Sequence, residues 1–322
     1  MPKESFRKAK RWHREEIHMR DSFVFTSRSE ETYYLFGTTF ADGQGDIEPQ
    51  FEVYISSDLE EWEGPYCAFH PQKGFWGVRH YWAPEVFELN GRFYMFATFK
   101  GGIGVHRGTG ILVADQPEGP YEPLVNEPAT PPEWECLDGT YHRDKEGQNW
   151  IVFCHEWTTE YEGKIMAQRL SEDLTQRIGK PFEILNAAKM PWIEKFGDPR
   201  IEKDGYLTDA PFFYTTKDGE LLMLWSSYSK PELRPDGKSG YTVAIARSKS
   251  GDMTGPWTHD EELLMNFNAG HPSLFHDFSG ALHICTHYPD TPHGNERPLF
   301  LPVEEINNTI VIKEKPDYIN WR

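Results

Sequence analysis

The segment GRFYMFAT (91–98) has four counterparts along the chain, each a short run of apolar and aromatic residues introduced by a glycine or a glutamate. The counterparts are ETYYLFGT (31–38), GQNWIVFC (147–154), GELLMLWS (219–226) and GALHICTH (280–287). Successive segments begin 56 to 72 residues apart in the 322-residue chain. A repeat of this length, built of short β-rich runs and turns, is typical of a β-propeller with one blade per repeat. We therefore predict an all-β fold, a single five-bladed β-propeller domain spanning residues 1–322.

A second mark recurs in four of the repeats, a glycine and a proline placed before an aromatic residue. These are Gly64-Pro65-Tyr66, Gly119-Pro120-Tyr121, Gly179-Lys180-Pro181-Phe182 and Gly255-Pro256-Trp257. Because proline cannot donate to a sheet ladder, such a turn leads into an outer or edge strand. Each repeat therefore resembles a blade of four antiparallel strands. The fifth repeat lacks the mark, and we expect one end of the chain, residues 1–18 or 308–315, to complete its blade.

An ionisable residue precedes each of the five segments. These residues are Asp21, Glu85, Asp138, Asp209 and His271; four lie 9 or 10 residues before their segment, and Glu85 lies 6 before. If each borders the innermost strand of its blade, all five converge on one axial pocket. A buried ring of carboxylates is costly unless it has a function, so we expect this pocket to be an active site.

The same rim of an up-and-down blade carries the start of its first strand and the end of its second. We expect the residues there to bind substrate, namely Arg20, Trp82, Glu85, His155, Glu156, Trp225 and His287. Acids beside flat aromatic rings suit a sugar, since its C–H faces stack on the rings while its hydroxyls form hydrogen bonds.

The composition argues against several classes of partner. The formal net charge of −18 repels polyanions, so nucleic acid and anionic membrane surfaces are poor partners. Residues 1–18 are charged and do not resemble a secretion signal, and no apolar run is long enough to span a membrane. Four widely spaced cysteines without a Cys-x-x-Cys pair are typical of reduced thiols. We expect a cytoplasmic protein that takes an oligosaccharide substrate and no organic cofactor.

Five motifs resemble glycoside hydrolase family 43, and they cover nearly the whole chain in the family's order. They are RDSFV (20–24), HYWAPEVFELNGRFYMF (80–96), ECLDGTYHRDKEGQNWIVF (135–153), YLTDAPFFYTTKDGELLMLW (206–225) and AGHPSLF (269–275). The most specific piece is Trp-Ala-Pro-Glu followed by a strand. The resemblance implies a five-bladed propeller of inverting enzymes, mostly α-L-arabinofuranosidases, β-xylosidases and arabinanases.

The resemblance also implies roles for individual residues. Asp21 would be the general base, and Asp138 would raise the pKa of the general acid and help to orient it. The carboxylate of blade four, Asp209, would be that acid. His271 would correspond to the family's axial histidine, which is often associated with a bound calcium ion.

The chain departs from the family pattern at the acid. The family has a glutamate followed by Gly-Pro, whereas this chain has Thr208-Asp209-Ala210-Pro211. Aspartate is shorter by one methylene, about 1.5 Å. An inverting enzyme needs its two carboxyl groups roughly 6.5–9.5 Å apart to admit a water. Glu156, at the pocket end of the second strand of blade three, is therefore the alternative acid.

The resemblance implies an inverting glycosidase, which we expect to release terminal L-arabinofuranose or D-xylose from short oligosaccharides. Two other classes of function stay open. One is a catalytically silent sugar-binding propeller, in which the aspartate at position 209 has removed the acid. The other is a protein-interaction platform, which fits a ring of axial carboxylates less well. The sugar, the linkage and exo or endo action depend on the shapes of loops.

Overall fold

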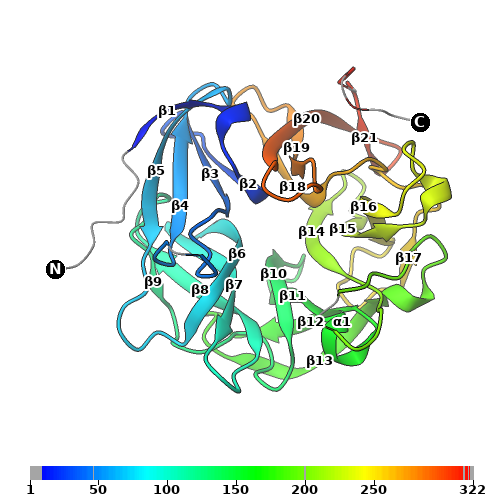
Figure 1. The fold of residues 1–322 in the computed structure, drawn as a ribbon, viewed down its shortest axis with the longest axis horizontal. Helices are drawn as coiled ribbons and strands as arrows, with labels where there is room; N and C mark the ends of the chain where they lie inside the picture. The colour runs from blue at the N-terminus through cyan, green and yellow to red at the C-terminus, as the bar shows by residue number, and fades with distance from the viewer. Residues whose placement is uncertain (1–8, 46, 199–200, 315, 318, 320–322) are drawn as a thin grey trace.

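The computed structural model describes residues 9–45, 47–198, 201–314, 316–317 and 319. The strands of these residues form five sheets arranged around a central axis (Figure 1). One sheet has five strands and the other four have four strands each. This arrangement confirms the predicted all-β, five-bladed propeller. The prediction that residues 1–322 form one domain includes ends outside the described residues, and it stays a prediction.

The blades follow one another along the chain, and each begins with its innermost strand. Blade one contains β2 (Arg20–Ser27), β3 (Thr32–Thr38), β4 (Phe51–Ser56) and β5 (Glu61–Phe69). Blade two contains β6 (Gly77–Leu89), β7 (Arg92–Gly101), β8 (Arg107–Ala114) and β9 (Glu122–Pro123). Blade three contains β10 (Cys136–Arg143), β11 (Asn149–His155), β12 (Lys164–Leu170) and β13 (Arg177–Asn186). Blade four contains β14 (Asp209–Thr215), β15 (Leu221–Ser229), β16 (Gly240–Ser248) and β17 (Trp257–His259). Blade five contains β18 (Gly270–His276), β19 (Leu282–Tyr288), β20 (Arg297–Ile306) and β21 (Thr309–Ile312).

Helical segments are short and lie in the connections between strands. They are α1 (Trp157–Glu160) and the 3-10 turns η1 (Arg14–Glu16), η2 (Ala187–Lys189) and η3 (Pro231–Leu233). Among the described residues, no helix is long and apolar enough to cross a membrane.

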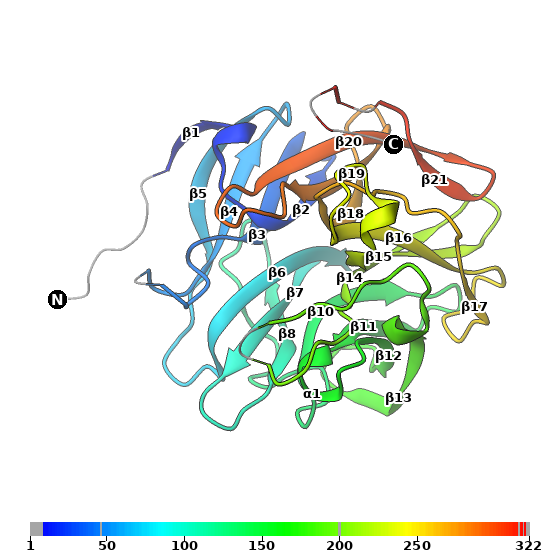
Figure 2. The same ribbon diagram turned by 45° about the vertical axis from the view of Figure 1, so that its right-hand side comes forward.

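The predicted outer strands are confirmed. Each Gly-Pro mark lies in or just before the fourth strand of its blade counted from the axis, β5, β9, β13 or β17. The C-terminal strand β21 completes blade five by pairing with β20. At the other end of the chain, β1 (Lys10–His13) pairs with β5 and adds a fifth strand to the outer edge of blade one (Figure 2). Blades one and five are therefore each complete by themselves, and the ring closes through contacts between them.

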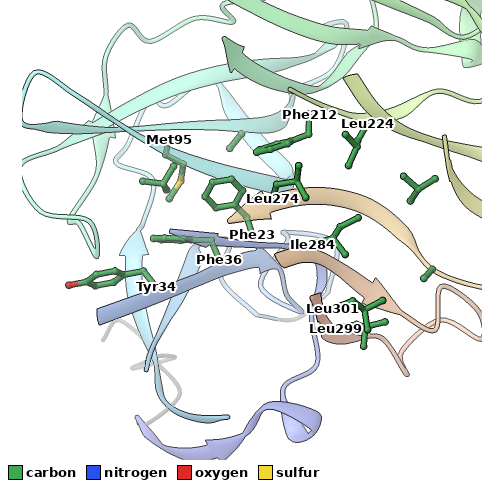
Figure 3. Close-up of a cluster of buried hydrophobic side chains, with 14 of the residues drawn as sticks. Phe23, Tyr34, Phe36, Met95, Phe212, Leu224, Leu274, Ile284, Leu299 and Leu301 are labelled. Atoms are coloured by element: carbon green, nitrogen blue, oxygen red, sulfur yellow. The ribbon is translucent and has the colours of Figure 1, made fainter. Parts of the chain in front are cut away.

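The largest buried cluster joins blades one, two, four and five (Figure 3). Phe23 of β2 meets Phe212 of β14 with their ring centroids 6.4 Å apart, and it meets Phe87 of β6 at 5.9 Å. Burial of each such aromatic side chain stabilises the fold by about 1.5–3 kcal/mol. Because Phe23 follows Asp21 by two residues on the same strand, apolar rings fill the axis next to the first candidate carboxylate. Apolar packing therefore lies directly beside the carboxylate of Asp21 on β2.

Candidate active site

All five innermost strands share one backbone distortion near their start. The register with the second strand shifts there, and one residue of each blade adopts a positive φ. These residues are Asp21 (51°), Ala83 (47°), Asp138 (51°), Ala210 (53°) and His271 (58°). Residues with a Cβ seldom adopt such a φ, and a bulge at this point redirects the side chain. The recurrence therefore defines equivalent positions in the five blades.

The backbone N–H of each equivalent residue is bound by a side chain of the preceding blade. In four blades the acceptor lies at the end of the preceding blade's second strand, as in Ala83 to Thr38 (2.8 Å), Asp138 to Thr98 (2.8 Å), His271 to Ser226 (2.9 Å) and Asp21 to His287 (3.1 Å). In blade four, Ala210 N–H donates instead to Oδ2 of Asp138, at 3.1 Å. The carboxylate of Asp138 therefore holds the start of blade four in place.

The equivalent positions correct the predicted ring of five ionisable residues. Asp21, Asp138 and His271 occupy them, whereas blades two and four have Ala83 and Ala210 there. Asp209 lies one residue before its equivalent position, and Glu85 lies two residues after. Sequence spacing missed this difference because the turns between first and second strands differ in length. In the sequence, only the shorter spacing of Glu85 indicated that it is not equivalent to the other four residues.

Asp21 lies in contact with a histidine and a hydroxyl. Oδ1 is 3.2 Å from Nδ1 of His271, and the Thr38 hydroxyl donates to Oδ2 at 2.6 Å. Burial alone would raise the pKa of Asp21, but the charge and hydrogen bond of His271 hold it well below its usual range. Asp21 is therefore ionised at neutral pH and able to accept a proton from water.

His271 lies between two carboxylates. Its Nδ1 is also 3.8 Å from Oδ2 of Asp138. Burial would lower the pKa of the imidazole, but Asp21 and Asp138 raise it to about 9. The pKa of Asp138 is raised to about 6, because burial and the charge of Asp21 outweigh the cationic His271. A cationic His271 thus partly balances the negative charge of the site.

Asp209 occupies an environment that favours its protonated form. The hydroxyl of Tyr241 donates to Oδ2 of Asp209 at 3.0 Å. Burial, followed by the negative charge of Asp138, raises the pKa of Asp209 well above its usual range. A carboxylic acid that keeps its proton near neutral pH can protonate a leaving group. Asp209 is therefore suited to act as a general acid.

Glu156, the alternative acid, is bound by an arginine. Nη1 of Arg107 is 2.6 Å from Oε1 of Glu156, and the Thr158 hydroxyl donates to Oε2 at 3.0 Å. The charge of Glu156 contributes to the pKa of both Asp138 and Asp209, so the three carboxyl groups share one electrostatic environment. In these contacts Glu156 accepts hydrogen bonds from a guanidinium and a hydroxyl.

Arg107 is a site residue that sequence reasoning missed. It lies at the start of β8, a third strand, where the repeat carried no signal. Its guanidinium is 4.8 Å from the ring centroid of Trp82, and Trp82 donates its indole N–H to Asp42 at 3.3 Å. Trp82 and Glu156, both predicted to bind substrate, are thereby linked through Arg107.

Arg20 is bound by acidic side chains of blade five. It forms ion pairs of 2.8 Å with Asp290 and with Glu296. Arg20 immediately precedes Asp21, and its charge helps to lower the pKa of that carboxyl. The structure places Arg20 beside the base, within a network that joins blades one and five.

Two of the predicted substrate-binding residues do not reach the pocket. Trp225 is 0% exposed and packs against Trp192, with ring centroids 5.2 Å apart. Adjacent strand residues point to opposite faces, and Ser226 is the one that contacts the axial His271. His287 is also 0% exposed, and its Nδ1 accepts the N–H of Asp21. The prediction that these two side chains bind substrate is wrong, because both are part of the supporting core.

His155 and Glu85 are also buried. His155 stacks on Trp134 with ring centroids 4.4 Å apart. Glu85 accepts a hydrogen bond of 2.6 Å from the Thr140 hydroxyl, and burial raises its pKa to about 8. Thr140 lies two residues along β10 from Asp138, so Glu85 lies further along the axis than the ring of equivalent positions. These contacts give His155 and Glu85 supporting positions, and a contact with substrate stays a prediction for both.

The side chains around His271 offer few ligands for the expected calcium ion. Within the described parts of the chain, no three His, Cys, Asp or Glu side chains are grouped so as to hold a metal ion. Nδ1 of His271 already faces Asp21, which leaves one ring nitrogen, whereas calcium prefers six to eight oxygen ligands. A calcium ion at His271 would therefore depend on water ligands, and it stays a prediction.

Comparison with known proteins relates this geometry to carbohydrate-active enzymes. The family model described as glycosyl hydrolases family 43 matches residues 18–303. A crystal structure of endo-arabinase from Bacteroides thetaiotaomicron has a TM-score of 0.82 and 38% identity, covering 94% of this chain and 99% of that chain.

Two curated proteins are also similar in sequence. The extracellular exo-alpha-(1->5)-L-arabinofuranosidase ArbA of Cellvibrio japonicus is 25% identical over 260 residues, which are 76% of this chain and 68% of that protein. An extracellular endo-alpha-(1->5)-L-arabinanase of Thermotoga petrophila is 23% identical over 284 residues, which are 78% of this chain and 53% of that protein.

Proposed function

Because the chain belongs to glycosyl hydrolases family 43, and is thus a glycoside hydrolase, we propose that it hydrolyses α-L-arabinofuranosidic bonds with inversion. The observation that carries the proposal is the contrast between two carboxyl groups at one pocket. Asp21 is held ionised by His271, while Asp209 is held protonated by burial and by the charge of Asp138. One can therefore take a proton while the other gives one.

The reaction follows from these two protonation states. Asp209 donates its proton to the glycosidic oxygen as the bond from that oxygen to the anomeric carbon breaks. Asp21 removes a proton from a water whose oxygen bonds to the same carbon from the opposite face. The products are the alcohol of the leaving sugar and a free sugar of inverted configuration. At the end of the turnover the proton on Asp21 must return to Asp209 through solvent.

Glu156 has a different part in this proposal. Its carboxylate, held by Arg107, accepts hydrogen bonds from sugar hydroxyls and orients the substrate. Asp138 keeps the pKa of Asp209 high through its own negative charge and holds the adjacent backbone at Ala210. In this proposal Asp209 is the acid and Asp21 is the base. Asp138 raises the pKa of the acid, and Glu156 binds the substrate.

The choice of L-arabinofuranose rests on the relatives. The support is an exo-α-(1→5)-L-arabinofuranosidase at 25% identity, whose name states this sugar, and an endo-arabinase at 38% identity. D-xylose, which the sequence left open, has no comparable support. A cytoplasmic location stays a prediction, and the two curated relatives are named as extracellular proteins.

The experiment compares nitrophenyl α-L-arabinofuranoside, nitrophenyl β-D-xyloside and α-1,5-linked arabino-oligosaccharides as substrates. We expect turnover of the arabinosides, and proton NMR of the first product formed should show the anomer opposite to that of the substrate. A protein that binds arabino-oligosaccharides without any turnover would instead be a silent sugar-binding propeller. Retention of the anomeric configuration would contradict the roles given to Asp21 and Asp209.

A further inference from the structure

A hollow of about 500 Å³ opens beside Asp21, between the loops of blades one and five. Its lining includes His18, Arg20, Thr38, Phe40, Asp42 and Glu296. Pockets for small ligands usually measure about 300–1,000 Å³. The hollow is thus large enough for a sugar unit, and none of the roles described above uses it.

Two lining residues connect the hollow to the candidate active site. The Thr38 hydroxyl donates to Oδ2 of Asp21 at 2.6 Å and accepts the N–H of Ala83 at 2.8 Å. Oδ2 of Asp42 accepts the indole N–H of Trp82 at 3.3 Å. Thr38 therefore both lines the hollow and contacts the carboxylate of Asp21, so the hollow lies directly beside the candidate base.

Phe40 gives the hollow an exposed aromatic face. Its side chain is 52% exposed, although most of the aromatic side chains of the chain are buried or half-buried. The ring of His18 lies 5.5 Å from that of Phe40. An exposed aromatic ring at the edge of the hollow is suited to the apolar face of a sugar ring.

The charges of the hollow favour a neutral ligand. Its arginine, Arg20, is already neutralised by Asp290 and Glu296, at 2.8 Å each. Asp42 adds a further acidic side chain to the lining. Carboxylate oxygens accept hydrogen bonds from hydroxyls but repel an anionic group. A neutral sugar unit therefore fits this lining better than a phosphate or a uronic acid.

The position of the hollow decides which sugar unit it would hold. The unit that leaves must lie beside the general acid, Asp209, on β14 of blade four. The hollow is lined by residues 18–20, 38–40, 42, 45, 47, 293–294 and 296 of blades one and five, on the side of Asp21. Building on the proposed function, we propose that it binds the sugar unit that precedes the cleaved one, with Phe40 as its platform. The enzyme then binds two sugar units on the side of the cleaved bond that lies away from the leaving group. It therefore releases arabinobiose from a linear chain.

The test measures the products formed from α-1,5-linked arabinotetraose labelled at its reducing end. We expect the wild type to release arabinobiose first. Phe40→Ala should raise KM for the tetraose about tenfold, shift the first product towards arabinose, and lose more activity on the tetraose than on a nitrophenyl arabinofuranoside. Phe40→Trp, which keeps an aromatic face, should keep the wild-type product pattern.

Tyr66→Ala serves as a matched control, because Tyr66 is an aromatic residue of blade one that is 36% exposed and lies on the outer strand β5. It should change neither KM nor products. Release of arabinose alone by the wild type, with no change in Phe40→Ala, would overturn the inference while leaving the proposed function intact. Failure of the wild type to cleave any arabinoside would refute the proposed function itself, and the inference with it.

Discussion

Nη1 of Arg107 lies 2.6 Å from Oε1 of Glu156, and this contact separates the two candidates for the general acid. The Arg107 guanidinium donates to Glu156, so this carboxyl group acts as a hydrogen-bond acceptor. Asp209 instead accepts a hydrogen bond from the Tyr241 hydroxyl, and burial together with the charge of Asp138 raises its pKa. The aspartate that departs from the family pattern thus has the environment of an acid, in spite of its shorter side chain.

We expect Asp209→Asn to lose far more activity on a natural arabinobioside than on a nitrophenyl arabinofuranoside. Nitrophenolate leaves without protonation, whereas a sugar alcohol needs the proton of the acid, and loss of such catalysis costs about 10²–10⁴-fold. Steady-state kcat/KM on the two substrates measures the split.

Glu156→Gln is the comparison for this experiment. It should reduce kcat/KM on both substrates by a similar factor, as loss of uniform binding does. If the dependence on the leaving group appears in Glu156→Gln and not in Asp209→Asn, the acid lies in blade three.

Asp21→Asn should remove nearly all turnover and leave the fold intact. The amide keeps the shape and can still accept the Thr38 hydroxyl, but it cannot take a proton from water, which typically costs about 10²–10⁴-fold in rate. Asp218→Asn is a matched control, since Asp218 is exposed in the turn between β14 and β15. Circular dichroism checks the fold of both variants, and wild-type turnover by a folded Asp21→Asn protein would refute its role as the base.

Asp138→Asn should shift the basic limb of the pH profile. Activity falls as the pH rises through the pKa of the acid, because the acid must hold its proton. The charge of Asp138 raises the pKa of Asp209, so removing that charge lowers it and activity is lost at a lower pH. The asparagine oxygen can still accept the N–H of Ala210, and an unchanged basic limb of kcat/KM would show that Asp138 does not tune the acid.

Glu85→Gln should make the stability of the protein less dependent on pH. Burial raises the pKa of Glu85 from 4.5 to about 8, so the folded state binds more protons than the unfolded state between these values. Stability from this group is therefore complete below pH 4.5 and is lost as the pH rises through about 8. We expect the melting temperature to fall less between pH 5 and pH 8 in Glu85→Gln than in the wild type, and equal slopes would contradict the buried state of this carboxyl.

The fold could be predicted from the sequence because its signals are local. Each second strand is a short apolar run, and each Gly-Pro mark lies at an outer strand. The site was predicted less completely, because its geometry depends on a bulge whose position the spacing does not reveal. Trp225 was placed in the pocket although its neighbour Ser226 faces the axis, and a one-residue difference reverses the face of a strand residue. Arg107 was missed because its partner, Glu156, lies 49 residues away in another blade.

The closure of the ring has a consequence for the order in which the enzyme becomes active during synthesis. Asp21 is made early, yet its N–H binds His287, which lies 266 residues further along the chain, and its carboxylate binds His271. Both partners belong to blade five, which contains only strands from the C-terminal part of the chain. Contacts of such sequence separation form late and slowly. A nascent chain with four finished blades therefore holds a base without its cationic partner, and catalytic competence arrives only when the last blade docks against the first.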